Sequence, residues 1–442
     1  VAMTIGSLLF MITAFLVVGG IVATPFLIDT IAPGFVGGKR DLTIKLVQIF
    51  FPGTGMVVMS AWCLGILNSH RRFFLSYAAP VIWNVAIIAT LLFFGKDTSQ
   101  YDLAIITGWG LVAGSFLQVL VQIPTTIKLL KYFRPRLDTK VIHVQIIMKN
   151  FVPSVVSRGV VQVSSYIDNI LASLLPTGAV SALAYAQTIY LLPVSLFGMS
   201  ISASELPEMS SIVGSQEVIY QKLRERLQNS IQKISFYIVP SLCAFLILGD
   251  VLVAALYQTG EFNAKNTQVV WVVLIGSSVG LLASTIGRLY ASTFYSLKDT
   301  KTTLYFAFAR IFFTTILGYL FAFKLAPMIS PDPMYATAGL TSSAGISGWI
   351  EFYLLRRKLN SIIGTTGVVW RYQSKLWGSA LMAAAIGLSV KWFIHLPILS
   401  HPVMRAAGVF SIYGVLYFAI TYVIAIPESQ MIINKIRSKI GR

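Results

Sequence analysis

Charged residues are scarce in this sequence: Asp, Glu, Lys and Arg make up 11% of its 442 residues, whereas a soluble domain contains about a quarter. The only two cysteines, Cys63 and Cys243, lie in apolar stretches, which excludes a disulfide framework. The four histidines show no metal-ligand spacing, and no phosphate-binding loop, nucleophile motif or catalytic carboxylate pair is present. We therefore predict that the protein is not an enzyme and uses no metal or cofactor.

Hydrophobic residues are abundant instead, at 56% of the chain, and long apolar runs recur from end to end. A helix needs about 20 apolar residues to cross a bilayer, and the short alternating segments of an outer-membrane barrel are missing. The sequence thus predicts an all-α polytopic membrane protein with about 12 transmembrane helices. The predicted spans are residues 3–31, 44–67, 74–94, 103–130, 146–175, 178–204, 230–257, 267–295, 302–325, 334–355, 373–396 and 403–426.

The net charge of +18 follows the membrane topology. Most of the 34 Lys and Arg residues fall in alternate loops and in the C-terminal tail, which is the bias that places loops in the cytoplasm. The basic excess therefore predicts a cytoplasmic C-terminus and gives no indication of nucleic-acid binding. Only three cations lie well inside spans: Arg158, Arg288 and Arg310.

An internal repeat is suggested by spacing. Phe35 and Ser69 are 34 residues apart, as are Phe262 and Ser296, and at this offset Gly53 falls on Gly280. Both copies run the same way through the membrane, which is typical of parallel transporter repeats. The second copy is preceded by two more spans, so two further helices are expected before residue 1.

This interpretation divides the chain into three parts. We expect an N-terminal lobe of four helices over residues 1–135 and a C-terminal lobe of six helices over residues 136–360. An extra helix pair with a basic cytoplasmic tail would occupy residues 361–442.

A polar stripe marks the span at 146–175. At helical spacing on one face of this span we find Ser154, Arg158, Gln162, Ser165 and Asn169, with Asp168 at the edge of the stripe. A charge at the bilayer centre costs roughly 2.5–3.5 kcal/mol on insertion scales, so such a face turns toward protein or water. We expect the stripe to line a hydrated cavity, although Ser and Gln also join helices and long arginines can reach toward the membrane surface. Arg288, and less so Arg310, are candidates for the same role.

Two other segments show structural patterns. Pro193, Gly198 and Pro207 are expected to kink the span that begins at residue 178, near whose end Glu205 and Glu208 are expected to be solvated or ion-paired. Residues 215–233 have the pattern of an amphipathic helix on the cytoplasmic surface.

Several strings resemble the MurJ (MviN) family of lipid II flippases, within the multidrug/oligosaccharidyl-lipid/polysaccharide exporter superfamily. The strings are FFPGTGMVVMSAWCLGILNSHRRF (50–73), YAAPVIWN (77–84), ASLLPTGAVSALAYAQTIYLLPVSLFGMSISASELPEMS (172–210), LYQTGEFNA (256–264) and FYSLKDTKT (294–302). The resemblance covers the whole chain from the third helix of the family onward. It implies two six-helix bundles plus two helices, here without the first two.

The resemblance implies a function: translocation of the undecaprenyl-diphosphate-linked peptidoglycan precursor, lipid II, across the bacterial cytoplasmic (inner) membrane by alternating access. The expected partners are lipid II, membrane lipids, and cell-wall synthesis and division proteins. Arg158 would bind the diphosphate through charge-assisted hydrogen bonds. Ser181, Gln187 and Thr188 match family positions near the cavity. The expected substrate-binding set is Arg158, Gln162, Ser165, Asp168, Asn169, Ser181, Gln187, Thr188 and Arg288.

The sequence departs from the family at two places. The cavity arginines of the first two helices are absent, and Gln187-Thr188 stands where many members have an Asp-Arg pair. Alternatives are therefore a related exporter of another lipid-linked oligosaccharide or of a small molecule, and a non-transporting cell-wall scaffold. A drug exporter would favour an acidic cavity, whereas here arginines outnumber deeply buried acids.

Overall fold

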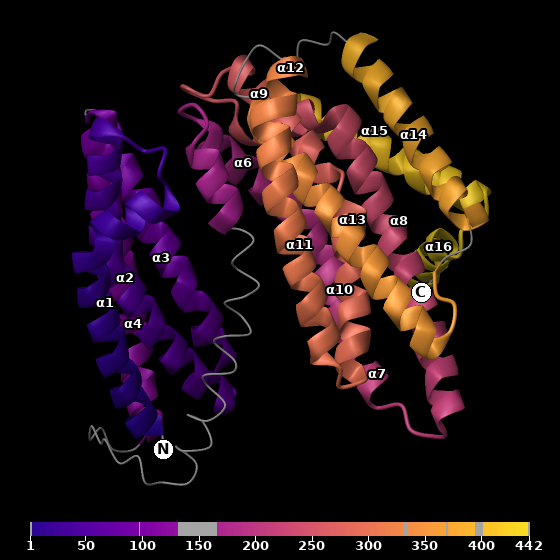
Figure 1. The fold of residues 1–442 in the computed structure, drawn as a ribbon, viewed down its shortest axis with the longest axis horizontal. Helices are drawn as coiled ribbons and strands as arrows, with labels where there is room; N and C mark the ends of the chain where they lie inside the picture. The colour runs from indigo at the N-terminus through magenta and orange to yellow at the C-terminus, as the bar shows by residue number, and fades with distance from the viewer. Residues whose placement is uncertain are drawn as a thin grey trace. The chain divides into compact units, whose positions relative to one another are not determined.

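The computed structural model describes residues 2–96, 98–130, 166–329, 335–367, 370–393 and 401–440. Within these ranges the regular structure is helical and no strand occurs, which confirms the all-α class. The chain forms two compact units, residues 1–162 and 163–442, and each is described by itself (Figure 1). The predicted boundary at 135/136 falls outside the described residues, and the three-part division stays a prediction.

Up to residue 130, the described part of the first unit is a bundle of four helices. They are α1 (Ala2–Ile31), α2 (Gly37–Ser69), α3 (Phe73–Phe94) and α4 (Gln100–Leu130). Buried polar side chains join α2 to α4: Ser60 Oγ donates to Gln122 Oε1 at 2.7 Å, and Gln118 Nε2 donates to Ser60 Oγ at 2.7 Å. Because a buried polar group costs free energy unless it is paired, this chain of bonds fixes the register of the two helices.

The second unit contains the remaining elements. Residues 166–173 are helical. They are followed by α6 (Ala179–Pro193), η1 (Val194–Met199), α7 (Ser200–Ser210), α8 (Gln216–Tyr257), α9 (Ala264–Ser278), α10 (Leu281–Ser296), α11 (Thr300–Leu320), η2 (Phe321–Leu325), α12 (Ala326–Ile329), α13 (Ala336–Ile363), α14 (Trp370–Phe393), α15 (Pro402–Val423) and α16 (Pro427–Ile440).

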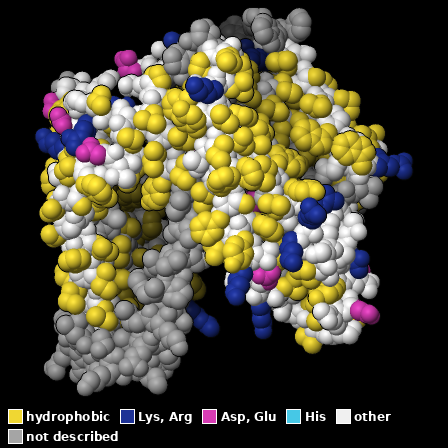
Figure 2. Space-filling model, viewed as in Figure 1, with side chains coloured by type: hydrophobic (Ala, Val, Ile, Leu, Met, Phe, Trp, Pro, Cys, Tyr) yellow, Lys and Arg dark blue, Asp and Glu magenta, His cyan; other side chains and the backbone are white. Residues whose placement is uncertain are grey.

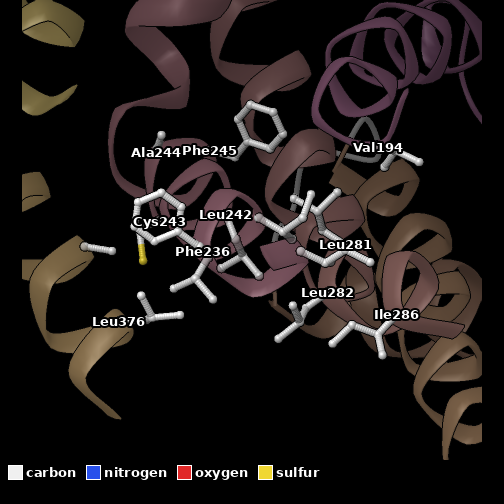
Figure 3. Close-up of a cluster of buried hydrophobic side chains, with 14 of the residues drawn as sticks. Val194, Phe236, Leu242, Cys243, Ala244, Phe245, Leu281, Leu282, Ile286 and Leu376 are labelled. Carbon is white, nitrogen blue, oxygen red and sulfur yellow. The ribbon is translucent and has the colours of Figure 1, made fainter. Parts of the chain in front are cut away.

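Helix α8 provides the core of this unit. Its 42 residues include Phe236, Cys243 and Leu248, all fully buried. Figure 3 shows the centre of this core, where Phe236 and Leu242 from α8 lie near Leu281 and Leu282 from α10. Tyr413 and Tyr417 of α15 bind backbone carbonyls of α8 at 2.7 Å, so the C-terminal helices are attached to the lobe by buried hydrogen bonds.

The amphipathic helix expected over residues 215–233 is present, but its placement as a separate helix on the cytoplasmic surface is wrong. Ser215 is the N-cap and residues 216–233 are the N-terminal part of the long helix α8, in which Leu223, Leu227 and Ile231 are buried. No helix-breaking residue separates this stretch from the span, so the helix continues for about 63 Å at 1.5 Å per residue. The apolar stripe faces other helices of the lobe.

Eight helices in the described ranges are long and apolar enough to cross a membrane, or nine when the bent pair α9–α10 is one span. The predicted spans 334–355 and 373–396 correspond to α13 and α14, with 28 and 24 residues. These two are long enough to cross but are more polar. Figure 2 shows hydrophobic side chains over most of the visible described surface, with Lys and Arg near its margins, as expected for a surface in contact with lipid.

The helix ends reproduce the predicted repeat. Gly37 and Ala264 begin α2 and α9, and Ser69 and Ser296 end α2 and α10; each pair is 227 residues apart. The copies differ at their middle, because α2 is continuous whereas α9 and α10 meet at a bend of 42°. At that bend Gly280 lies against Gly345 of α13, where an added Cβ would come within 2.5 Å of Gly345 Cα.

Candidate functional site

The predicted polar stripe is only partly described by the structure. Arg158, Gln162 and Ser165 lie outside the described residues, and their place in a cavity stays a prediction. Asp168 and Asn169 lie in the helical residues 166–173.

Helical residues 166–173 are held in the second unit by apolar packing. Leu171 and Ala172 form a buried cluster with Ala322 of η2 and with Ala336 and Leu340 of α13. Gly318 of α11 allows the approach, since an added Cβ there would lie 3.1 Å from Leu171 Cδ1. This packing holds Asp168 beside α11 and α13.

The Asp168 carboxyl lacks a complete set of partners. Its Oδ1 is buried and makes no hydrogen bond, and no ion pair to it occurs within the described part of the chain. The positive charge of Arg310 acts on it. A buried polar atom without a partner costs roughly 1–3 kcal/mol, and Oδ1 of Asp168 is one of several such atoms in the described part of the second unit.

Arg310 is bound to a second carboxylate. Its Nη1 lies 3.1 Å from Glu351 Oε2, which joins α11 to α13. The Nε of Arg310 is buried without a hydrogen bond. Arg310 was considered at the sequence level but left out of the expected substrate-binding set, and Glu351 was not considered at all. Glu351 is the only acidic residue in the predicted span 334–355, which was the signal that could have identified it.

Arg288 of α10 completes this group of charges. Its side chain is exposed, and the charges of Arg310 and Glu351 and the Tyr190 hydroxyl act on it. The Tyr190 hydroxyl is 2.7 Å from Ser284 Oγ, which joins α6 to α10. We refer to Asp168, Arg288, Arg310 and Glu351 as the charge cluster. It contains two of the predicted site residues, Asp168 and Arg288, on each of which the charge of Arg310 acts.

The expected site residues on α6 are all exposed: Ser181, Gln187 and Thr188. The Thr188 hydroxyl donates to the carbonyl of Ala184 in its own helix at 3.0 Å. Within the described residues of the second unit, no hydrogen bond or ion pair joins these three side chains to the charge cluster, and their part in substrate binding stays a prediction.

The expected irregularity after α6 is present as a π-helix. Element η1 follows Pro193, and Gly198 within it lies against α10, where an added Cβ would come within 2.4 Å of Thr285 Cγ2. Pro207 by contrast lies inside the regular helix α7. π-helical turns inside helices are frequent at functional sites.

Charged side chains form ion pairs between α7 and α8 and a cap at the start of α11. Arg226 of α8 pairs with Glu205 at 3.0 Å and with Glu208 at 3.2 Å on α7, which confirms the expected ion pairing. Asp299 caps α11: its Oδ1 accepts from the Thr302 amide at 3.0 Å and its Oδ2 from the Thr302 hydroxyl at 2.6 Å. These hydrogen bonds hold the pKa of Asp299 below its usual value.

Many apolar spans, a parallel repeat and charges at span depth in the described helices are the architecture of a polytopic membrane transporter. A solved structure titled "Lipid II flippase MurJ, inward closed conformation" superposes with a TM-score of 0.76 at 21% identity, covering 96% of this chain and 83% of that one. An inward-facing multidrug exporter of the MATE family superposes with a TM-score of 0.64 at 15% identity. These likenesses show the fold.

The family model described as "Lipid II flippase MurJ" matches residues 1–404, so the chain belongs to this family. A probable lipid II flippase MurJ of Rhizobium meliloti (strain 1021) is 27% identical over 98% of this chain and 80% of its own length. The lipid II flippase MurJ of Burkholderia cenocepacia is 28% identical over 84% of this chain and 71% of its own length.

Proposed function

We propose that this protein translocates lipid II across the bacterial cytoplasmic membrane by alternating access, as a transporter and not as an enzyme. The observation that carries the proposal is the family match over residues 1–404. The two compact units and the repeat of helix ends support it, because transporters of this class work by rearranging repeated bundles around a central site.

The proposed site recognises the diphosphate of lipid II. Arg158 is the main candidate, since a guanidinium binds phosphate oxygens through charge-assisted hydrogen bonds. Gln162, Ser165 and Asn169 would supply further hydrogen bonds from the same helix face, and Arg288 further positive charge. Ser181, Gln187 and Thr188 are proposed to contact the substrate from α6.

The proposed orientation follows the distribution of basic residues. The C-terminus, with Lys435, Arg437, Lys439 and Arg442, would lie in the cytoplasm. Membrane lipids would surround the exposed apolar surface of both units. Cell-wall synthesis and division proteins are proposed as protein partners.

Binding of lipid II to the purified protein tests the site. Native mass spectrometry would compare the wild-type protein with Arg158→Ala and with Lys96→Ala, a matched loss of one exposed cation outside the stripe. We expect lipid II, but not a neutral lipid, to be retained by the wild type and by Lys96→Ala, and retention to fall at least tenfold in Arg158→Ala. Equal retention in all three would remove Arg158 from the site, and loss of selectivity in the wild type would contradict the assigned substrate.

A further inference from the structure

Helices α14 and α15, the C-terminal pair, lie beside α8 in the second unit (Figure 1). Their polar side chains bind α8 at five places between residues 232 and 250, a length of about 27 Å at about 1.5 Å per residue. The bonded pairs are Tyr372 with the Gln232 carbonyl, Gln373 with Ser235, Tyr417 with the Phe236 carbonyl, Tyr413 with the Pro240 carbonyl, and Lys391 with Asp250. The C-terminal pair is thus joined to α8 by polar contacts along most of the depth of a membrane.

Pro240 interrupts the backbone hydrogen bonds of α8. Because proline has no N–H, the carbonyl of Phe236, four residues earlier, loses its helical donor. Helix α8 is nevertheless unbroken from Gln216 to Tyr257. The hydroxyl of Tyr417 in α15 donates to the Phe236 carbonyl at 2.7 Å, and both side chains are buried. A neighbouring helix therefore supplies the donor that the proline lacks, which is how prolines are tolerated in membrane spans.

Tyr413 makes a bond of the same length to a carbonyl of a different kind. Its hydroxyl donates to the Pro240 carbonyl at 2.7 Å. That carbonyl still has the amide of Ala244 as its helical donor, since Ala244 lies four residues further along the same helix. The bond of Tyr413 is therefore added to a complete set of helical bonds, whereas the bond of Tyr417 replaces a missing one.

Helix α1, the counterpart of α8 in the first unit, shows that this helix can form without the proline. At the offset of 227 residues Thr13 corresponds to Pro240, so α1 keeps the amide there. Where α1 does contain a proline, at Pro25, the freed carbonyl of Ile21 accepts from Gln48 Nε2 of α2 at 3.2 Å. In both units a carbonyl freed by proline is bound from a neighbouring helix, and in α8 that neighbour belongs to the C-terminal pair.

The residue after Phe236 joins α8 to the π-helical turn η1. The rings of Tyr237 and Phe197 are stacked, with centroids 4.4 Å apart and an interplanar angle of 5°, and Phe197 lies in η1. Two consecutive residues of α8 thus contact different neighbours: Phe236 contacts α15 through Tyr417, and Tyr237 contacts η1. A change of backbone direction at this point of α8 would act on both.

We propose that Pro240 is a hinge in α8 and that Tyr417 is its latch. In the latched state, which the structure describes, the Tyr417 hydroxyl binds the Phe236 carbonyl and α8 is unbroken. In the released state this hydrogen bond is open and α8 bends at Pro240, the usual site of a kink in a helix that contains a proline. Only hydrogen bonds change between the two states, and the stack of Tyr237 on Phe197 carries the bend to η1.

The hinge offers a link to transport, and this link rests on the proposed function. Element η1 continues from α6, the helix that carries the proposed substrate contacts Ser181, Gln187 and Thr188. Hinges are a common means by which one part of a transporter moves against another. Release of the latch would let α6 and η1 move while the C-terminal pair keeps its other contacts with α8.

Hydrogen–deuterium exchange of the full chain in lipid bilayers tests the latch without substrate. Tyr417→Phe removes only the hydroxyl and leaves a buried carbonyl without a partner, so the exchange of the amides of residues 241–244 should rise by at least about tenfold. Tyr413→Phe is the matched control. It removes the same group one helical turn away, from a carbonyl that keeps its helical donor, and should change this exchange by less than about twofold.

A second variant separates the latch from a packing role of Tyr417. Pro240→Ala restores the amide that the Phe236 carbonyl lacks, so adding Tyr417→Phe to Pro240→Ala should no longer raise the exchange. An equal rise with and without Pro240→Ala would show that the tyrosine only packs, and would overturn the proposal. Equal effects of Tyr417→Phe and Tyr413→Phe on the wild-type background would overturn it as well.

Transport of lipid II in reconstituted liposomes tests the use of the hinge. We expect Pro240→Ala, which removes the hinge but keeps the helix, to lower the initial rate at least about threefold. If the exchange results hold and Pro240→Ala transports at the wild-type rate, the link to transport is wrong. If the exchange results hold and the wild type transports no lipid II, the latch stands and the proposed function fails.

Discussion

Arg71 and Lys298 have the same left-handed backbone conformation, with φ of 58° and 61°, in turns that lie 227 residues apart. The surrounding hydrogen bonds also match. The Arg71 amide donates to the carbonyl of Asn68, and the Lys298 amide donates to that of Tyr295. Because few residues other than glycine adopt this conformation, its recurrence at the repeat offset shows that both copies connect their second and third helices by the same turn.

At the left-handed positions of these turns, we expect substitution by glycine to stabilise the protein. The left-handed backbone conformation costs a residue with a side chain roughly 1–2 kcal/mol in the folded state. Glycine avoids this cost, but it also makes the unfolded chain more flexible, which cancels part of the gain in stability. We expect Arg71→Gly and Lys298→Gly each to stabilise the protein by about 0.5 kcal/mol, measured as a higher thermal unfolding midpoint in detergent. Ala425→Gly should behave likewise, since its φ is 61°.

The control for these variants is a cation in a regular helix. Lys222 is an exposed residue inside α8, where glycine costs about 0.5–1 kcal/mol. Lys222→Gly should therefore lower the midpoint. If all of these glycine variants lowered the midpoint alike, the strain argument would be wrong.

Two glycines of helix α13 should respond to alanine substitution in opposite ways. A Cβ at Gly345 would lie 2.7 Å from the backbone nitrogen of Gly280, whereas nothing lies within 4 Å of one at Gly348. We expect Gly345→Ala to destabilise the protein by about 1–3 kcal/mol through overpacking. Gly348→Ala should be neutral or stabilise it by up to about 1 kcal/mol. Thermal unfolding of the two variants side by side checks this, and equal midpoints would contradict the close packing at the bend.

Asp299 predicts a dependence on pH. Its folded pKa is lowered by the Thr302 hydrogen bonds, so its contribution to stability is present above the unfolded pKa, about 3.9, and is lost as the pH falls through the folded pKa. At neutral pH, Asp299→Ala should cost about 1 kcal/mol, the usual value of a helix cap. The deficit should shrink near pH 3, as measured by unfolding midpoints at both pH values.

The matched variant is Asp299→Asn, which keeps a capping oxygen but cannot ionise. Its deficit should be small and the same at both pH values. A deficit of Asp299→Ala that does not change with pH would show that the carboxylate charge makes no contribution to the cap.

The apolar spans and the repeat were predictable because they depend on composition and spacing within the chain. The helix ends at Ser69 and Ser296 lie at the two positions that the repeat spacing had matched. Residues 215–233 show the limit of this approach, since an amphipathic pattern does not say whether its apolar face meets lipid or protein. The burial of Leu227 in the lobe is a tertiary fact.

The pairing of Arg310 with Glu351 could not be predicted for the same reason. The two residues are 41 positions apart, and only the packing of α11 on α13 brings them together. The bend between α9 and α10 likewise depends on a neighbour. The Trp349 Nε1 of α13 donates to the carbonyl of Val279 at 2.8 Å and satisfies the backbone there.

Transport of lipid II itself tests the central claim most directly. The purified protein would be reconstituted into liposomes containing lipid II, and the lipid II accessible to a membrane-impermeant enzyme would be followed over time. We predict that the accessible fraction rises from the outer-leaflet share toward the whole, and that the rise is lost in Arg158→Ala but not in Lys96→Ala. An accessible fraction that stays at the outer-leaflet share with the folded wild-type protein would contradict the account.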